Sequence, residues 1–137
     1  MYSFPTISSH TRRNTLIALI LCGASLARAE DSFREQVAPI LERYCVRCHH
    51  EDKRKGKLAL DTETALRKGG RRGKIVVPGD PQASRLIDFV TGSKPRMPKD
   101  ADPLSQAEVD ALRRWIADGA HWPEGVTLTS GFADLDW

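Results

Sequence analysis

The chain has 137 residues and a formal net charge of +3. The basic excess lies in residues 1–29, which hold three arginines and no acid, so the rest of the chain is balanced and gives no electrostatic argument for nucleic-acid binding. The length suffices for one hydrophobic core but not for two.

Residues 1–29 have the pattern of a secretory signal peptide. Two adjacent arginines precede an apolar run, residues 16–26, that is too short to cross a bilayer, and residues 27–29 (Ala-Arg-Ala) fit the small-x-small cleavage pattern. We expect the mature chain to begin near Glu30 in the periplasm or another exported bacterial compartment, without a stable membrane span. An uncleaved membrane anchor is the alternative.

The first element expected of the mature chain is an amphipathic helix that ends near residue 44. Ser32 and Glu35 have the spacing of a capping box, and Pro39 is expected to kink or shorten the helix. Apolar residues recur at three- and four-residue steps along one face: Phe33, Val37, Ile40, Leu41 and Tyr44.

Residues 45–49 read Cys-Val-Arg-Cys-His. This pattern is typical of a c-type haem attachment site, in which two thiols bond to the porphyrin and the adjacent histidine binds its iron. The spacing predicts one covalent haem c on Cys45 and Cys48, with His49 as an iron ligand. A thioredoxin-like pair needs no such histidine. Structural zinc needs a second ligand pair, and the third cysteine, Cys22, lies in the predicted signal peptide.

Four short elements are expected between the haem motif and residue 92. The leucines alternate in residues 58–61, and a helix over residues 62–68 ends at a glycine pair. Residues 75–77 (Ile-Val-Val) form an extended wall of a haem pocket or part of the core. The Asp-Pro pair at residues 80–81 predicts the start of a helix that ends before Gly92.

Met97 is the one methionine that remains after the predicted cleavage. Prolines at positions 95 and 98 hold the backbone out of a helix and suit a stiff loop that aims the thioether. We interpret Met97 as the second axial ligand of the iron, rather than as a core residue. His121 stays an alternative ligand, whereas His50 is too near the covalent attachment to reach the opposite face easily.

The last expected helix has a second capping box, Ser105 with Glu108, and a stop at Gly119. Its apolar stripe is expected to pack on the first helix and consists of Val109, Leu112 and Ile116, with Trp115 beside it. We therefore place one domain at residues 30–122, followed by a C-terminal tail, residues 123–137, of unknown role.

The charges of the expected domain are unevenly distributed. Ten Lys or Arg and four Asp or Glu lie between Arg47 and Lys74, whereas eight acids and two arginines follow from Asp100 onward. Such a dipolar surface can orient a charged partner during encounter, although a charge run is more often a solvated face.

The haem motif is one of six segments that form an ordered pattern along the chain: Val37-Ala38-Pro39-Ile40-Leu41, Cys45 to His49, Leu58-Ala59-Leu60-Asp61, Pro78-Gly79-Asp80-Pro81 with Ser84, Arg96-Met97-Pro98, and Trp115-Ile116-Ala117-Asp118-Gly119-Ala120. With them the sequence resembles the planctomycete-type cytochrome c domain, a branch of the class I cytochrome c superfamily. The resemblance implies an all-α fold, a small helical bundle around one haem with His49 proximal and Met97 distal. Lys99 departs from the family, in which a second proline is common at that place.

These residues predict an exported monohaem c-type cytochrome that carries single electrons and is not an enzyme. We expect a monomer that exchanges electrons with redox proteins of unknown identity, because no other catalytic constellation is visible in the sequence. Two alternatives stay open. One is a haem enzyme or gas sensor with an open distal site, and the other is a haem-bearing module that docks a larger exported enzyme.

Overall fold

Helices make up the regular secondary structure of residues 28–130, which are the residues described by this computed structural model. No strand occurs in that range, where the β-type pairing is an isolated bridge between Gly70 and Gly73. The predicted all-α class is therefore confirmed for the described residues. None of the helices within 28–130 has the length and apolar character needed to cross a membrane.

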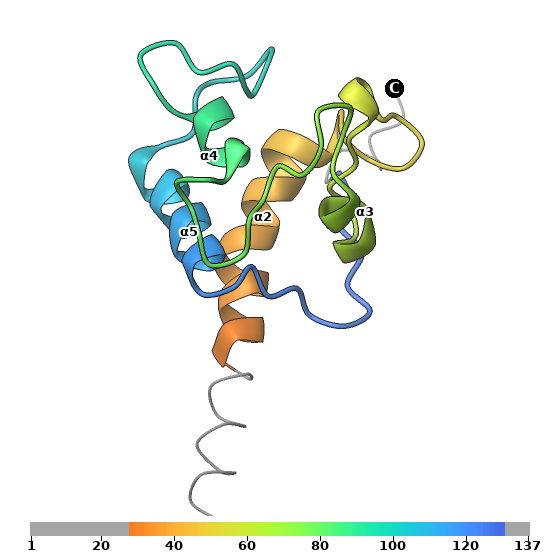
Figure 1. The fold of residues 1–137 in the computed structure, drawn as a ribbon, viewed down its shortest axis with the longest axis vertical. Coiled ribbons are helices and arrows are strands. Elements are labelled where there is room, and N and C mark those ends of the chain that lie inside the picture. Colours follow the sequence, from red (N-terminus) through yellow and green to blue (C-terminus); the bar gives the residue numbers. More distant parts are fainter. Residues whose placement is uncertain (1–27, 131–137) are drawn as a thin grey trace, which may run out of the picture.

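The N-terminal helical segment runs through residues 28–46 and leads directly into the cysteine motif (Figure 1). It comprises η1 (Phe33–Val37), α2 (Ala38–Leu41) and η2 (Glu42–Val46) after its first turn. The capping box predicted at Ser32 is wrong, because Ser32 is itself helical and its side chain accepts no capping hydrogen bond. The predicted signal peptide lies outside the described residues, apart from residues 28 and 29.

Pro39 changes the hydrogen-bond pattern of this segment without ending it. Its ring has no N–H and would crowd the carbonyl four residues earlier. The turn before it widens to a π-type turn, in which the Ala38 N–H donates to the Phe33 carbonyl, and α2 continues from there. The helix therefore continues to residue 46 despite the proline.

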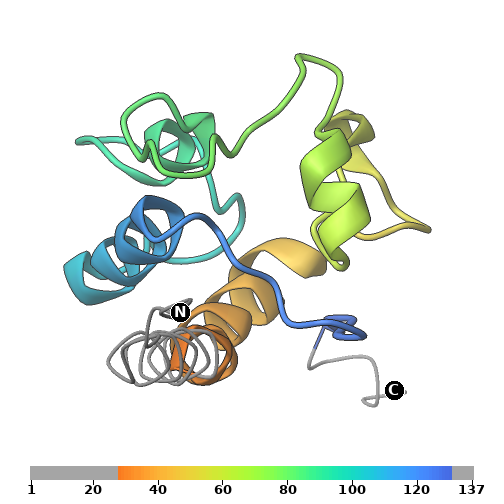
Figure 2. The same cartoon turned by 60° about the horizontal axis from the view of Figure 1, so that its bottom comes forward.

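The helix predicted at residues 62–68 is confirmed as α3 (Glu63–Lys68). The Thr62 hydroxyl accepts a hydrogen bond from the Ala65 N–H at 3.2 Å, and Gly69 ends the helix with φ of 75°. A single 3₁₀ turn, η3 (Lys55–Lys57), lies in the loop between the cysteine motif and α3. In Figures 1 and 2, α3 lies on the side of the molecule away from α4 (Arg85–Val90) and α5 (Gln106–Ala117).

The helix α4 begins several residues later than the Asp-Pro pair predicted. The Asp80 carboxylate accepts hydrogen bonds from the two backbone N–H groups two and three residues onward, at 3.0 and 2.9 Å. The fully buried Ser84 hydroxyl donates to the Asp80 carbonyl at 2.7 Å and accepts from the Val77 N–H at 2.8 Å. These bonds hold residues 80–84 in a turn instead of a first helical turn.

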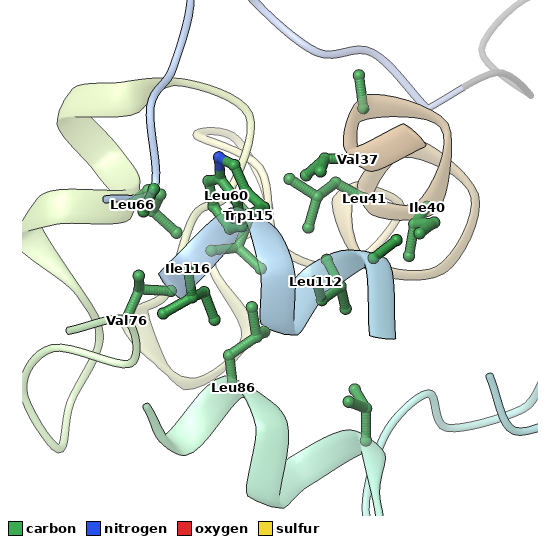
Figure 3. Packing of buried hydrophobic residues seen from close by; sticks show 14 of the residues in the cluster. Val37, Ile40, Leu41, Leu60, Leu66, Val76, Leu86, Leu112, Trp115 and Ile116 are labelled. Carbon is green, nitrogen blue, oxygen red and sulfur yellow. The ribbon is translucent and has the colours of Figure 1, made fainter. Parts of the chain in front are cut away.

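The helix α5 has the capping box that the sequence predicts. The Ser105 hydroxyl accepts from the Glu108 N–H, and the Glu108 carboxylate accepts from the Ser105 N–H at 2.7 Å. The glycine stop is also confirmed, since Gly119 has φ of 100° just beyond the helix. In Figure 3, α5 lies between α2 and α4, with Leu112, Trp115 and Ile116 reaching into the shared core.

The helix α5 runs antiparallel to the N-terminal helical segment. Near the start of that segment, Phe33 packs on Trp115, from the last turns of α5, with ring centroids 5.9 Å apart. Near its end, the Tyr44 hydroxyl interacts with Glu108, from the first turn of α5. The expected packing of the two helices is confirmed, and it gives the bundle a Tyr44 end and a Phe33 end.

Residues 123–130 pack against the domain. Leu128 is buried, its N–H donates to the Asp61 carbonyl at 2.8 Å, and the Thr129 N–H donates to the Glu42 carboxylate at 3.2 Å. The first half of the predicted C-terminal tail thus covers the region where the cysteine motif meets α3. Residues 131–137 lie outside the described residues.

Candidate functional site

The cysteine motif forms a tight turn at the end of the N-terminal helical segment. Cys45 belongs to η2, and its carbonyl accepts hydrogen bonds from the N–H groups of Cys48 and His49, at 3.1 and 3.0 Å. Both thiols are free, and all three side chains are partly buried. A helix end and one turn therefore hold the two thiols and the imidazole, as the local sequence pattern indicates.

His49 is tied to the following segment through its backbone. The Leu60 N–H donates to the His49 carbonyl at 2.8 Å, which fixes residues 58–61 beside the motif. Burial lowers the pKa of the imidazole, a shift that nearby carbonyls of Lys55 and Leu58 oppose and the Lys55 charge reinforces. The shift favours the neutral form of the ring, which is the form that binds a metal.

Two side-chain atoms near the cysteine motif are buried without a hydrogen-bond partner among the described residues. They are Nδ1 of His49 and Oδ1 of Asp61. The other carboxylate oxygen of Asp61 accepts from the Glu51 N–H at 3.1 Å, which closes the loop after the motif. The polypeptide therefore satisfies the imidazole only in part, since its Nδ1 has no partner whereas the carbonyls of Lys55 and Leu58 act on the ring.

Cys45 packs against the hydrophobic core, although part of the residue reaches solvent. Burial raises the pKa of its thiol to about 12, so the folded polypeptide holds Cys45 protonated at neutral pH. In residues 28–130, no three His, Cys, Asp or Glu side chains converge closely enough to share a metal ion. Within this range, Cys45, Cys48 and His49 are therefore not grouped as ligands of one shared ion.

The residue before the motif links it to α5. Burial raises the pKa of Tyr44, and the neighbouring Glu108 carboxylate raises it further. Burial acts to raise the pKa of Glu108 as well, but hydrogen bonds from Ser105 and Tyr44 outweigh that effect and lower it. The charge of Asp102 also acts on Tyr44. Residues 102–108, which include the first turn of α5, therefore lie at the end of the bundle that carries Cys45.

Met97 lies in the segment that connects α4 to this same end of α5. Its N–H donates to the carbonyl of Phe89, in α4, at 2.8 Å, and its side chain packs, partly buried, against the core. In Figure 1 this segment and the end of η2 both lie in the upper half of the molecule. The fold thus brings Met97 to the Tyr44 end of the bundle, by a route separate from that of Cys45, Cys48 and His49.

His121 lies at the opposite, Phe33 end of the bundle. Its carbonyl accepts from the Trp115 indole N–H at 2.8 Å, and the next residue, Trp122, packs on Phe33 with ring centroids 4.7 Å apart. Phe33 and Cys45 are separated by twelve residues of helix, which corresponds to about 18 Å. This placement disfavours His121 as a partner of the cysteine motif.

His50 remains beside the motif, as its position in the sequence requires. Its Nδ1 lies 3.9 Å from the carboxylate of Asp52, which is almost fully exposed. Its neighbour in the chain, His49, is held by the turn described above. His50 therefore lies next to an exposed carboxylate. Its position follows from that of its neighbour His49.

Exposed basic residues gather on the α3 side of the molecule. Arg54 pairs with Glu51 and Arg67 pairs with Glu63, whereas the other exposed cations have no carboxylate within salt-bridge distance among the described residues: Arg47, Lys53, Lys55, Lys57, Lys68, Arg71, Arg72 and Lys74. Exposed acids at Asp100, Asp102 and Asp118 precede or follow α5, but Lys94, Lys99 and Arg114 are exposed there as well. The cation-rich run of the sequence therefore lies around α3, whereas the region of α5 carries charges of both signs.

A surface hollow of about 610 Å³ lies between α4 and α5, lined in part by Ile87, Thr91 and Arg114. Neither the cysteine motif nor Met97 contributes to its lining. The hollow is therefore separate from the candidate site.

Residues 45–101 match the family model described as planctomycete cytochrome C. This span begins at the first cysteine of the motif and includes Met97. Comparison with curated proteins and with solved structures gave no match.

Proposed function

Because residues 45–101 match the family model described as planctomycete cytochrome C, we propose that this protein is an exported monohaem c-type cytochrome that carries single electrons. The observation that carries the proposal is the turn at residues 45–49, which holds two free thiols and a neutral imidazole at the end of a helix. Export and cleavage near Glu30 rest on the sequence pattern alone. We also propose that the protein is a monomer.

The donor set at this turn suits a covalently attached haem. Cys45 and Cys48 would form the two thioether bonds, and His49 would bind the iron. The bound haem supplies the exchange of one electron between the ferric and ferrous states. The polypeptide contributes a histidine with a fixed backbone, since the N–H of His49 is bonded within the turn and its carbonyl is bonded to Leu60.

Met97 is the proposed ligand on the second face of the iron. It enters from the loop that leads to α5, at the same end of the bundle as Cys45, whereas His121 belongs to the other end. A thioether opposite an imidazole favours ferrous iron and raises the reduction potential. An iron bound on both faces would need no change of ligands between its two oxidation states, which leaves little to rearrange when its charge changes.

Replacing Met97 by alanine is expected to open the iron to added ligands. Wild-type protein matured with haem in a periplasm should show a methionine-to-iron charge-transfer band when ferric and should resist carbon monoxide when ferrous. Met97→Ala should lose the band and bind carbon monoxide readily. Absorption spectra of both oxidation states measure each effect.

His121→Ala is the matched control for this measurement, because it removes the other strong ligand considered and should leave both spectra unchanged. Ready binding of carbon monoxide by the wild type, or an unchanged spectrum in Met97→Ala, would show that Met97 is not the ligand. The open-site enzyme or gas sensor would then be the better interpretation.

The partner we propose is a redox protein whose docking surface is acidic. The unpaired cations on the α3 side lie in the segment that includes the cysteine motif, residues 47–74, so an acidic surface would be drawn toward the attachment site. The proposal concerns the encounter and its rate, since exposed charges contribute little to affinity.

This charge distribution predicts opposite salt effects for two small oxidants of the ferrous protein. The rate with hexacyanoferrate(III), an anion, should fall as ionic strength rises from about 0.01 to 0.1 M, where the screening length shortens from about 30 to 10 Å. The rate with tris(phenanthroline)cobalt(III), a cation, should rise or stay level. Stopped-flow absorption measures both rates.

The double variant Lys53→Gln with Lys55→Gln should slow the reaction with the anion, whereas Arg114→Gln, which removes an exposed cation on α5, should not. Equal effects of the two variants, or equal salt dependence for the two oxidants, would contradict a steering role for the α3 side.

A further inference from the structure

Phe89 holds two successive residues of the loop that carries Met97. Its carbonyl accepts the Met97 N–H at 2.8 Å, and its ring lies under the guanidinium of Arg96, whose central carbon is 4.5 Å from the ring centroid. A cation at this distance over an aromatic face is attracted by the ring. One residue of α4 therefore fixes both the backbone and the neighbouring side chain of Met97.

The helix that provides Phe89 is itself anchored. Leu86, Ile87 and Val90 are buried in the core. Figure 3 shows Leu86 reaching from α4 toward α5. The ring of Phe89 is only partly buried, which leaves one face open to the cation. The contacts at Phe89 thus connect the Met97 loop to a helix whose apolar side chains are buried in the core.

A second cation lies over the same ring but belongs to another segment. The guanidinium carbon of Arg85 is 5.6 Å from the Phe89 centroid, and its Nη1 donates to the Arg72 carbonyl at 2.8 Å. Arg85 is thereby tied to the segment before residue 75, with no bond to the loop of Met97. Arg85 therefore serves as a comparison: it places the same charge over the same ring, but it lies farther from the ring and is bonded to a segment other than the Met97 loop.

We propose that Phe89 and Arg96 are positioning residues for the iron ligand Met97, and that the contact between ring and guanidinium limits how readily the Met97 sulfur leaves the iron. This inference rests on the proposed function, because it requires a haem whose second axial ligand is Met97. It assigns to Arg96 a role in ligand release, distinct from any bond to the haem itself.

The test is the affinity of the ferric, haem-loaded protein for added imidazole, which must displace the Met97 sulfur. The apparent affinity equals the intrinsic affinity multiplied by the fraction of molecules whose iron site is open. Loss of an exposed cation–π contact is worth a factor of roughly 2 to 5 in such an equilibrium. Arg96→Gln and Phe89→Leu should therefore each tighten imidazole binding about 2- to 5-fold.

Three comparisons separate positioning from a general effect on stability or charge. Arg85→Gln removes the second cation over the same ring and should leave the imidazole affinity unchanged. Arg96→Lys keeps a cation and should restore much of the wild-type value. Arg96→Gln should have no effect once Met97 has been replaced by alanine, because no sulfur then remains to be held.

The outcomes distinguish the two proposals. If Met97→Ala itself leaves imidazole binding unchanged, methionine ligation is wrong and the positioning role is overturned with it. If Met97→Ala tightens binding but Arg96→Gln does not, or does so equally in the Met97→Ala background, only the positioning role is overturned. The amide hydrogen of Met97 should also exchange faster in Arg96→Gln than in Arg85→Gln, which checks the contact without reference to the iron.

Discussion

The double variant Cys45→Ser with Cys48→Ser is expected to lose covalent haem attachment completely. A serine hydroxyl does not form the thioether bond that a cysteine thiol forms with a haem vinyl group, so the loss is all-or-none. Denaturing electrophoresis with a haem stain should show no stained band, and the mass of the intact chain should lack the mass of haem. Retention of the haem mass in this variant would refute attachment at these residues.

Each single replacement should have an intermediate result. One thioether remains, so the haem mass stays with the chain, but one vinyl group stays conjugated with the porphyrin. The reduced pyridine complex should then absorb at a longer wavelength than that of the wild type. Cys22→Ser is the matched control: it removes the third cysteine of the chain, lies outside the described residues in the predicted signal peptide, and should change neither result.

The parts of the site that are close together in the sequence could be predicted, because a turn of five residues places its own members. Cys45, Cys48 and His49 needed only the local pattern, because the bonds that form their turn, from the N–H groups of Cys48 and His49 to the Cys45 carbonyl, join residues of the motif itself. The side of the bundle on which Met97 or His121 lies depends on the antiparallel pairing of α5 with the N-terminal helical segment. That pairing joins residues far apart in the sequence, so the local patterns left both ligands open.

The two capping boxes show why a local pattern can succeed once and fail once. Ser105 has an extended backbone with ψ of 158°, and its hydroxyl is free to accept from the N–H of Glu108. Ser32 has the same spacing to an acid, but residues 28–31 before it are already helical, so its backbone has no cap geometry. The spacing alone does not indicate whether the helix extends upstream.

The start of α4 was misplaced for a tertiary reason. Asp80 does accept N–H groups, as a capping residue would, yet the buried Ser84 draws the next residues into a turn. The Gly79 N–H also donates to the Ile116 carbonyl of α5 at 2.7 Å, which holds this turn against another helix. Phe89 was missed for a similar reason, because its relation to Arg96 depends on how the loop folds back on α4.

Phe33→Ala is expected to produce the largest loss of stability in the molecule while sparing the iron site. Phe33 is fully buried and packs on both Trp115 and Trp122, with centroids 5.9 and 4.7 Å away. Removing a buried phenylalanine ring costs about 3–5 kcal/mol, a large part of the roughly 5–15 kcal/mol that holds a domain folded. Each lost kcal/mol lowers the melting temperature of a domain of this size by about 4–8 °C, which thermal unfolding of the haem-loaded protein measures.

The position of Phe33 makes this prediction specific. Because Phe33 lies at the end of the bundle away from Cys45, the folded variant should keep the wild-type absorption spectrum and imidazole affinity despite its lower melting temperature. Val77→Ala truncates a side chain that is 38% exposed and should change stability by no more than about 0.5 kcal/mol. A Phe33→Ala protein that melts with the wild type, or that loses its ferric charge-transfer band while folded, would contradict a bundle whose two ends serve separate purposes.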